Sequence, residues 1–566
     1  MSGIAGWVVP SREAREEEAV LPMLEALAPR HGAEEALFVY AHRGPRQQVV
    51  LGSTLWDQAS GIAIALDGAM ANARELRAQL AKRGFAFQQG SGAELLLRAY
   101  QYWDKDVVKQ LRGAFAFALW DLRKDRLFLG RDRFGEKPLY LAQAGERLAF
   151  ASEAKALLAL PGFRAEADLD AVRQCIAYRY VPGPATLFRG VRKLPPATGA
   201  MWQFGRLQET RYWIPPDRSP AAGAAVAEPV EGFIERFEEA VSLRAGGGVL
   251  LSGGIDSAAI VAVLARHGPG VKTFSLGFEG DRRSELPQAA AVAKHFGTAH
   301  HEIVVKPAEL IPGLARLVHA HDAPVATPSA LAVHRLASDA ARSVKSVVTG
   351  DGCDEIVGGY RKHVAERFHP GFCASMDDQG KRIAVALLPF DKDFSRGAEK
   401  KKSPPFDFDP RASSLRRALY RDQTTWLPDQ LLERNDRAAL AGAVDARMPF
   451  LDHRLAEYVS ALPDDQRVRG LATKWILRQA GRRLLPGPLA GRKAGFRLPI
   501  RDWLRNELRD TLVEHLQGGA SGTRRYYDAK VLDRLVGEHL KGKHNHEIPL
   551  WTLLNLEIWH RRYKPA

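Results

Sequence analysis

The chain has 566 residues, a formal net charge of +15 and a hydrophobic content of 46%. This length predicts two or more domains, and the composition is ordinary for a soluble globular protein. No apolar run reaches the length of a membrane-spanning helix, and the N-terminus lacks the basic and apolar regions of a secretory signal peptide.

The positive charge is spread along the chain rather than gathered in blocks. Its longest basic run is residues 400–402, and no basic stripe interleaved with aromatics indicates an RNA-binding surface. We therefore expect neither a membrane nor a nucleic acid as partner. The chain has only three cysteines, Cys175, Cys353 and Cys373, and no CxxC motif. This argues against a disulfide scaffold and against a zinc site. The cytoplasm is the expected compartment.

The first 205 residues alternate short β-like runs with a few helices. Residues 63–66 and 127–130 are predicted strands, and residues 71–83 and 93–102 are predicted amphipathic helices. Residues 113–121 alternate small with large side chains, as two facing sheets require. Residues 213–229 are rich in Pro and Ala, which predicts a linker.

From Glu231 the pattern becomes strand–helix–strand, typical of a parallel sheet with helices on its faces. The predicted strands are residues 248–251, 273–277, 301–305 and 346–349. Beyond about residue 411 the chain is predicted to be mostly helical. Residues 368–410, whose last part carries a lysine run and prolines, are predicted to be an exposed excursion.

A glycine-bearing loop, residues 252–257 with the sequence SGGIDS, lies between a predicted strand and a predicted helix. Such a turn places several backbone N–H groups around one point, and the helix dipole favours an anion there. Asp256 would repel a phosphate unless a cation lay between them, which implies Mg²⁺. No lysine follows the glycines, so this is not the GxxxxGK[ST] loop. The alternative is an ordinary strand–helix turn capped by Ser257.

Further motifs follow in a fixed order along the chain. They are residues 113–121, RDRFGEKPLY at 131–140, SEAK at 152–155, KLPP at 193–196, GDGCDE at 350–355 and DARMPFLD at 445–452. Together with SGGIDS they resemble the asparagine synthetase family over nearly the whole chain. The resemblance implies an α/β fold in two domains. An N-terminal Ntn-type αββα sandwich, glutaminase-like, would span residues 1–210. A linker would follow at 211–230, and an ATP-pyrophosphatase domain, with a parallel sheet and a helical C-terminal part, would span 231–566.

The N-terminal half departs from the family at the positions that the resemblance assigns to glutamine hydrolysis. Ser2 replaces the nucleophilic cysteine, whose α-amino group would act as base. The arginine that holds glutamine is missing around Leu55, and the residues around 30–34 are also degraded. Asp67 replaces the amide donor of the oxyanion hole, and Gly92 replaces the aspartate that grips the substrate amine. We therefore predict that glutamine is not the nitrogen source; a serine-dependent amidase is the alternative.

The second half keeps the residues that the resemblance assigns to ATP chemistry. The adenosine would be surrounded by Leu251, Leu276, Thr349 and Gly350, and the pyrophosphate would be held by Ser252, Gly253, Gly254 and Ser257. Asp256 and Asp354 would ligate Mg²⁺. Lys474 would neutralise the charge that develops during the reaction. Arg447 and Asp452 would shape the site, and residues 493–496 would form a cover.

Asp351 stands where related synthetases carry Glu or Tyr. It is a candidate base for the attacking amine, which must be unprotonated to react. Orientation of a backbone turn, or shielding of Mg²⁺, is an equally open role for this residue.

The implied reaction has two steps. A carboxylate attacks the α-phosphorus of ATP to give an acyl-adenylate and pyrophosphate, and an amine then displaces AMP to give an amide. Without glutamine, three products remain: ammonia-dependent asparagine, a β-lactam-type ring, or a macrolactam between a peptide's N-terminal amine and an Asp or Glu side chain, as in lasso peptide cyclases. The lost glutaminase residues favour the peptide cyclase, whose partners would be a precursor peptide and a leader protease. Relatives suggest a homodimer. A non-catalytic or RNA-linked ATP-binding module is the outside alternative.

Overall fold

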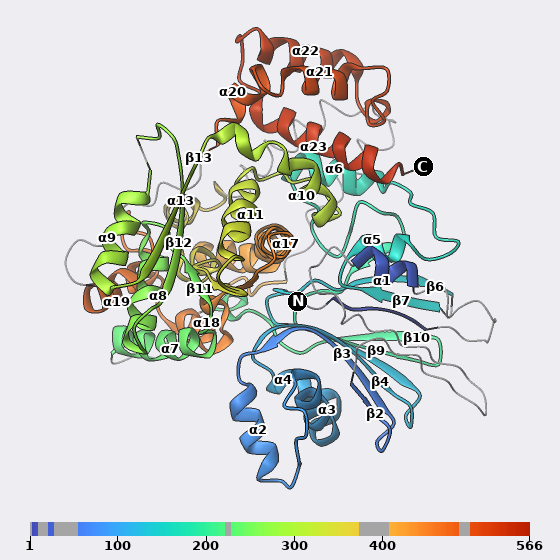
Figure 1. Ribbon diagram of the computed structural model, residues 1–566, viewed down its shortest axis with the longest axis vertical. Helices are drawn as coiled ribbons and strands as arrows, with labels where there is room; N and C mark the ends of the chain where they lie inside the picture. Colours follow the sequence, from blue (N-terminus) through green and yellow to red (C-terminus); the bar gives the residue numbers. More distant parts are fainter. Residues whose placement is uncertain are drawn as a thin grey trace.

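The computed structural model describes residues 3–8, 21–27, 55–145, 147–220, 228–282, 284–372, 407–485 and 498–565. Within these ranges, a half built on antiparallel sheets packs against a half built on a parallel sheet (Figure 1). The predicted α/β class is confirmed. No helix in the described ranges is long and apolar enough to cross a membrane.

Two antiparallel sheets face each other in the N-terminal half (Figure 1). One has the strand order β1–β7–β6–β8 and the other β10–β9–β5–β4–β3–β2. The strands are β1 (Ala5–Val8), β2 (Leu55–Asp57), β3 (Ile62–Met70), β4 (Gly113–Asp121), β5 (Arg126–Arg131), β6 (Tyr140–Ala144), β7 (Arg147–Ala151), β8 (Val191–Lys193), β9 (Thr198–Gln203) and β10 (Arg206–Arg211). The six-stranded sheet is covered by α2 (Ala73–Ala81), α3 (Gly92–Trp103) and α4 (Val107–Gln110), and the other by α1 (Leu21–Leu27), α5 (Ala154–Leu158) and α6 (Leu169–Tyr178).

Strand β4 shows why this half forms an αββα sandwich. Phe115 and Phe117 pack in the apolar cluster beneath α2 and α3, whereas Ala116 and Ala118 pack between the two sheets. Successive side chains of a strand point to opposite faces, so the large residues meet helices and the small ones let the sheets approach. The predicted alternation over residues 113–121 is confirmed.

A parallel five-stranded sheet with the order β13–β12–β11–β14–β15 organises the second half. Its strands are β11 (Gly248–Leu250), β12 (Lys272–Phe278), β13 (Ala299–Val305), β14 (Ser346–Val348) and β15 (Asp445–Arg447). One face is covered by α7 (Pro229–Leu243), α8 (Ile255–Arg266), α9 (Leu286–Phe296) and α19 (Trp475–Leu484), and the other by α10 (Gly313–His321), α11 (Ser329–Ala340) and α17 (Glu433–Ala441). The four predicted strands are confirmed within one to two residues at each end; β15 was not predicted.

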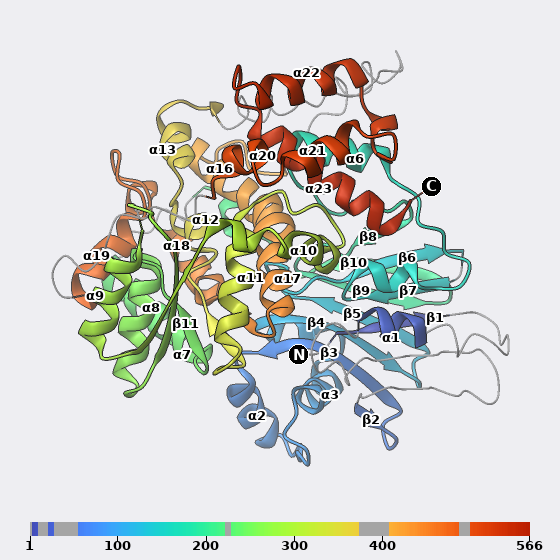
Figure 2. The same ribbon diagram turned by 45° about the horizontal axis from the view of Figure 1, so that its top comes forward.

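The remaining helices complete the second half. They are α12 (Cys353–Val357), α13 (Arg361–Phe368), α16 (Ser414–Arg421), the π-helix η4 (Asp422–Leu432), α18 (His453–Ala461), α20 (Ile500–Arg505), α21 (Arg509–Gln517), α22 (Ala529–Leu540) and α23 (Glu547–Tyr563). Figure 2 shows α20 to α23 gathered at one end of the molecule, beside α6 and α10. Trp559 of α23 donates a hydrogen bond to the Asp322 carbonyl oxygen at 3.0 Å, which ties this end to the segment after α10.

The strand order of the parallel sheet reverses between β11 and β14. From β11 the chain builds β12 and β13 on one side, and then crosses to build β14 on the other. The loops after β11 and β14 lie next to each other at the carboxyl end of the sheet, since a Cβ on Gly350 would lie 2.9 Å from Asp256 Cβ. Such a switch point is where open α/β sheets bind ligands, and the SGGIDS and GDGCDE motifs lie there.

Buried ion pairs join the two halves. They are Lys137 with Asp436 at 2.7 Å and Asp445 at 3.1 Å, Lys193 with Glu433 at 2.7 Å and Asp429 at 3.3 Å, Glu153 with Arg437 at 2.7 Å, Lys155 with Asp322 at 3.1 Å, and Arg112 with Asp452 at 2.9 Å. Three of the partners, Glu433, Asp436 and Arg437, lie on α17. Removing one member of a buried pair costs about 3–5 kcal/mol, so the N-terminal half holds this helix firmly.

Candidate active site

Serine hydroxyls close the loop between β11 and α8. Ser257 Oγ accepts a hydrogen bond from the Ser252 backbone N–H at 3.1 Å and donates one to the Ser252 carbonyl oxygen at 2.9 Å. Ser252 Oγ in turn accepts from the Gly254 N–H at 3.3 Å. A Cβ on Gly253 would lie 2.7 Å from Gln288 Cβ of α9, so only glycine fits there. The loop is thus a compact turn at the N-terminus of a helix, as an anion-binding loop requires.

The predicted adenosine and phosphate residues gather at the carboxyl edge of the sheet. Leu251 and Thr349 directly follow β11 and β14, Leu276 lies two residues before the end of β12, and their exposed fractions are 2%, 5% and 6%. Ser275 Oγ donates to the Leu251 carbonyl oxygen at 2.6 Å, which fixes the β11 end against β12. The structure therefore brings together residues that lie up to about a hundred positions apart in the chain.

Lys474 lies between the two predicted metal ligands. Its Nζ is 2.6 Å from Asp256 Oδ2 and 2.7 Å from Asp354 Oδ1. Burial alone would lower the pKa of the ammonium, but the negative charges, chiefly that of Asp256, outweigh it and raise the pKa well above its usual value. Lys474 also has a φ of +54°, a left-handed conformation that costs about 1–2 kcal/mol outside glycine. The structure thus holds a permanently charged lysine at the centre of the site.

The two carboxylates suit a magnesium ion. Both reach a single cationic nitrogen, so they converge on one position. Magnesium is commonly held by one or two carboxylates, with substrate phosphates and waters completing its octahedron. Within the described residues, no group of three or more His, Cys, Asp and Glu side chains forms a metal site. Asp256 and Asp354 would therefore hold Mg²⁺ together with the phosphates of ATP.

Three further residues of the site make close contacts with its charged side chains. A Cβ on Gly350 would lie 2.9 Å from Asp256 Cβ, and one on Gly359 would lie 1.8 Å from Asp354 Oδ1 and 2.3 Å from Lys474 Cε. Cys353 Sγ donates to Asp256 Oδ1 at 3.3 Å. Sequence reasoning found Gly350 but missed the roles of Gly359 and Cys353. The sequence signal available for Gly359 was the pair of glycines at residues 358–359, just after the helix that carries Asp354.

One carboxylate oxygen of Asp351 is held by a neighbouring hydroxyl. Thr349 Oγ1 donates to Asp351 Oδ2 at 2.8 Å, which fixes the carboxylate on the turn after β14. Within the described residues, the second carboxylate oxygen accepts no hydrogen bond from the protein. The hydrogen bond with Thr349 is compatible with orientation of the turn, and the role of Asp351 as a base stays a prediction.

The glutaminase positions that the structure describes are filled by local packing. Asp67 is 2% exposed and accepts a hydrogen bond from Ser152 Oγ at 2.7 Å. A Cβ on Gly92 would meet Leu66 Cδ2 at 3.0 Å and Met70 Cε at 3.5 Å, so apolar side chains border the place of the missing acid. Leu55 is half-buried in β2. Ser2, residues 30–34, the cover at 493–496 and most of the predicted excursion lie outside the described residues.

Asp452, which the motif predicts to shape the site, lies at the junction of the two halves. Its carboxylate binds Arg112 of the N-terminal half at 2.9 Å and Arg244 at 3.2 Å. Both arginines outweigh the effect of burial and lower the pKa of Asp452. It therefore acts at the junction of the halves rather than directly on a ligand.

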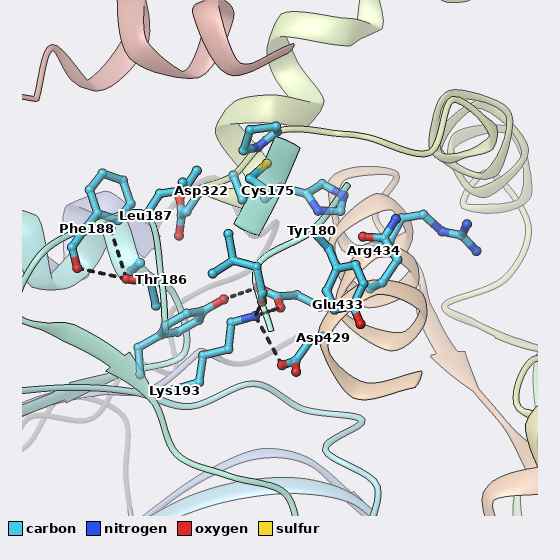
Figure 3. A pocket seen from close by; sticks show the side chains of 17 residues that line it. Cys175, Tyr180, Thr186, Leu187, Phe188, Lys193, Asp322, Asp429, Glu433 and Arg434 are labelled. Carbon is cyan, nitrogen blue, oxygen red and sulfur yellow. Dashed lines mark hydrogen bonds and ion pairs between the residues drawn. The ribbon is translucent and has the colours of Figure 1, made fainter. Parts of the chain in front are cut away.

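A cavity also lies at this junction (Figure 3). Tyr140 and Lys193 line it from the N-terminal half, and Asp429, Glu433 and Arg434 line it from η4 and α17. Neither Asp256 nor Asp354 borders it. The cavity is thus not bordered by the predicted metal ligands, although Arg434, which borders it, is within electrostatic reach of Asp351 in the GDGCDE turn.

Comparisons with known proteins agree with this geometry. A model of the asparagine synthase family matches residues 233–561, and a model of the glutamine amidotransferase domain matches residues 1–213. A putative asparagine synthetase (glutamine-hydrolyzing) of Mycobacterium bovis is 32% identical, covering 88% of this chain and 84% of that protein. Asparagine synthetase (glutamine-hydrolyzing) 1 of Bacillus subtilis is 28% identical, covering 89% and 86%. Amidase chry2 of Gibberella zeae is 27% identical, covering 75% of each.

Proposed function

The chain belongs to the asparagine synthase family and is an ATP-dependent C–N ligase; from that premise we propose that it joins a carboxylate to an amine without hydrolysing glutamine. The favoured product is a macrolactam, closed between a peptide's N-terminal amine and an Asp or Glu side chain. The precursor peptide and a leader protease would be its partners.

The cluster of Asp256, Lys474 and Asp354 carries the ATP-dependent part of the proposal. A carboxylate oxygen of the substrate bonds to the α-phosphorus while the bond to pyrophosphate breaks. Negative charge then grows on the leaving pyrophosphate, where Mg²⁺ held by the two aspartates, and the Lys474 ammonium, would stabilise it. A preorganised buried cation stabilises this growing negative charge more strongly in a water-poor site than it would in water.

Asp351 would act in the second step. The amine attacks the acyl carbon, the bond to AMP breaks, and the amine loses a proton. The unbonded carboxylate oxygen of Asp351 is suited to accept that proton.

Residues Asp67 and Gly92 support a nitrogen source other than glutamine. A buried carboxylate at position 67 would repel an oxyanion, where catalysis needs a hydrogen-bond donor. Among the described residues, the atoms nearest to a Cβ at position 92 belong to Leu66 and Met70, which offer no charge to a substrate amine. At position 2, the serine hydroxyl has a much higher pKa than the thiol of the cysteine that it replaces, so it is a poorer nucleophile. The relatives from Mycobacterium bovis and Bacillus subtilis are named as glutamine-hydrolysing enzymes, unlike the activity that we propose. A direct assay of glutamine hydrolysis distinguishes the two activities.

Ammonia-dependent formation of asparagine is the second candidate. It uses the same adenylating residues and needs no peptide site. The near relatives named asparagine synthetases favour it.

Carboxylate-dependent exchange of labelled pyrophosphate into ATP tests the proposal. Exchange with a peptide that carries a free N-terminal amine and an internal Asp or Glu, but not with free aspartate, would support the cyclase. Exchange with free aspartate alone would favour asparagine formation. No exchange with any carboxylate would contradict adenylation altogether.

A further inference from the structure

Helix α17 lies between the N-terminal half and the adenylation site. Glu433, Asp436 and Arg437, spaced i, i+3 and i+4, turn one face to the N-terminal half and form buried ion pairs there. Arg434 lies between these positions in sequence, but its side chain leaves the helix on another side. Figure 3 shows it extending away from Lys193 and Asp429.

Arg434 has only neutral partners in the described part of the chain. Its Nε and Nη2 donate to Asn435 Oδ1 at 3.0 and 2.9 Å, and its Nη1 donates to Ser329 Oγ at 3.3 Å. The contrast with Arg437, one turn along, is direct: that guanidinium binds the carboxylate of Glu153 at 2.7 Å.

The surroundings of Arg434 leave its charge incompletely balanced. Burial lowers the pKa of the guanidinium, and the charge of Asp351 offsets this only in part. The pKa of Arg437 is instead raised well above its usual value, because Glu153 outweighs burial. A partly buried guanidinium with neutral partners gains most from a bound carboxylate, whose two oxygens match its planar donors.

We propose that Arg434 binds the carboxylate that ATP activates and holds it beside Asp351. The inference rests on the proposed function, because it concerns the acyl donor of that reaction. It also gives the N-terminal half a purpose, since the ion pairs formed by Glu433, Asp436 and Arg437 fix the helix that carries Arg434.

The charge of the bound carboxylate determines which kinetic constant depends on Arg434. The donor carries its full negative charge before it reacts, and that charge moves to the phosphates as the acyl-adenylate forms. Arg434 therefore stabilises the bound donor at least as well as the transition state. Loss of such an interaction raises KM and leaves kcat nearly unchanged.

The test measures pyrophosphate exchange with the donor that supports it in the wild-type protein. Arg434→Gln is expected to raise the KM for the donor about 10- to 100-fold, the effect of losing a charge-assisted hydrogen-bond pair. The kcat and the KM for ATP should stay within about 3-fold. Arg434→Lys should recover part of the affinity, and added guanidinium ion should restore Arg434→Ala. Arg335→Gln, at an exposed arginine of α11, is the matched control and should change nothing.

A binding measurement keeps this inference separate from the activity. L-aspartate and a peptide with one internal Glu are titrated into the protein with Mg²⁺ and a non-hydrolysable ATP analogue. Donor binding that is lost only in Arg434→Gln supports the inference, even if no exchange is detected and the proposed reaction fails. Equal binding by the variant and the wild-type protein, or no binding by either, overturns it, and so does an unchanged KM for the donor.

Discussion

At the scale of single residues, Lys474 determines the charge balance of the candidate active site. Its ammonium neutralises Asp256 and Asp354, which would otherwise repel each other and any phosphate. When a magnesium nucleotide binds, the two aspartates would share their charge between the metal and the lysine. The same side chain therefore offsets the charge of the two aspartates and would serve the reaction.

Replacing Asp256 with Asn tests this arrangement. The amide removes one metal ligand and half of the charge that holds Lys474 in place. Pyrophosphate exchange should fall about 10²- to 10³-fold, as for the loss of one preorganised electrostatic contact, while the circular dichroism spectrum stays unchanged. Asp339→Asn, at an acid of α11 paired with Arg335, should keep full exchange. Retained exchange in the Asp256 variant would show that the loop does not hold the metal.

Replacing Gly359 with Ala tests the packing behind the cluster. The added methyl would overlap Asp354 Oδ1 and Lys474 Cε, so both charged groups must move. Misplacing catalytic groups by about 1 Å can cost about 10²-fold in rate, and we expect a loss of that order in pyrophosphate exchange. The matched variant Gly519→Ala adds its methyl where no heavy atom lies within 4 Å, and should exchange normally. Equal activity of the two variants would contradict the predicted geometry.

At the scale of elements, α17 depends on ion pairs for its position. Burial would raise the pKa of Glu433, but Lys193 outweighs burial and lowers it. A carboxyl group whose pKa is lower in the folded protein adds stability above its unfolded pKa, and this stability is lost as pH falls through the folded value.

Glu433→Gln should therefore destabilise the protein by about 3 kcal/mol at pH 7, the cost of breaking a buried pair. The difference in melting temperature from the wild type should shrink as pH falls below about 4.3, where the unfolded carboxyl becomes protonated. Glu238→Gln, which breaks the more exposed pair with Arg266, should cost less than about 1 kcal/mol. A difference for Glu433→Gln that does not change with pH would argue against the ion pair.

Sequence patterns predicted the long elements and missed those that depend on tertiary contacts. The alternation in β4 and the apolar run of β11 are local signals, so both strands could be found. Strand β15 has only three residues, and it forms because Ser346 to Val348 offer a sheet edge to pair with. The π-helix contains Pro428, which a sequence interpretation takes as a helix end.

The candidate site was found through motifs, and its unpredicted members are those that only folding brings together. Asp256, Asp354 and Lys474 stand in recognisable segments. Cys353 and Gly359 matter because of what packs against them, and Arg434 looks like any solvated charge on a helix until the position of Asp351 is known. The importance of these residues follows from distances between segments that are remote in the sequence. A local sequence pattern does not reveal such distances.

At the scale of the whole molecule, the N-terminal half is bound to the second half through buried charges. Lys137, Lys193 and Glu153 reach α17 from three different segments of that half. We infer that the half persists as a support for α17 and the cavity beside it.

Restoring the nucleophile alone should not restore glutamine hydrolysis. In Ser2→Cys, the thiol would return, but Asp67 and Gly92 would still replace the family's oxyanion donor and its anchor for the substrate amine. Glutamate release from glutamine should therefore stay at the background of the wild-type protein. Measurable hydrolysis by this single variant would show that the pocket is intact.

The most direct test of the central claim counts glutamate and AMP in one reaction. The protein is supplied with ATP, Mg²⁺, glutamine and the carboxylate donor that supports pyrophosphate exchange, and both products are measured over time. We predict that AMP accumulates with amide product while no glutamate is released. Glutamate formed in step with AMP would contradict the account, because the nitrogen would then come from glutamine.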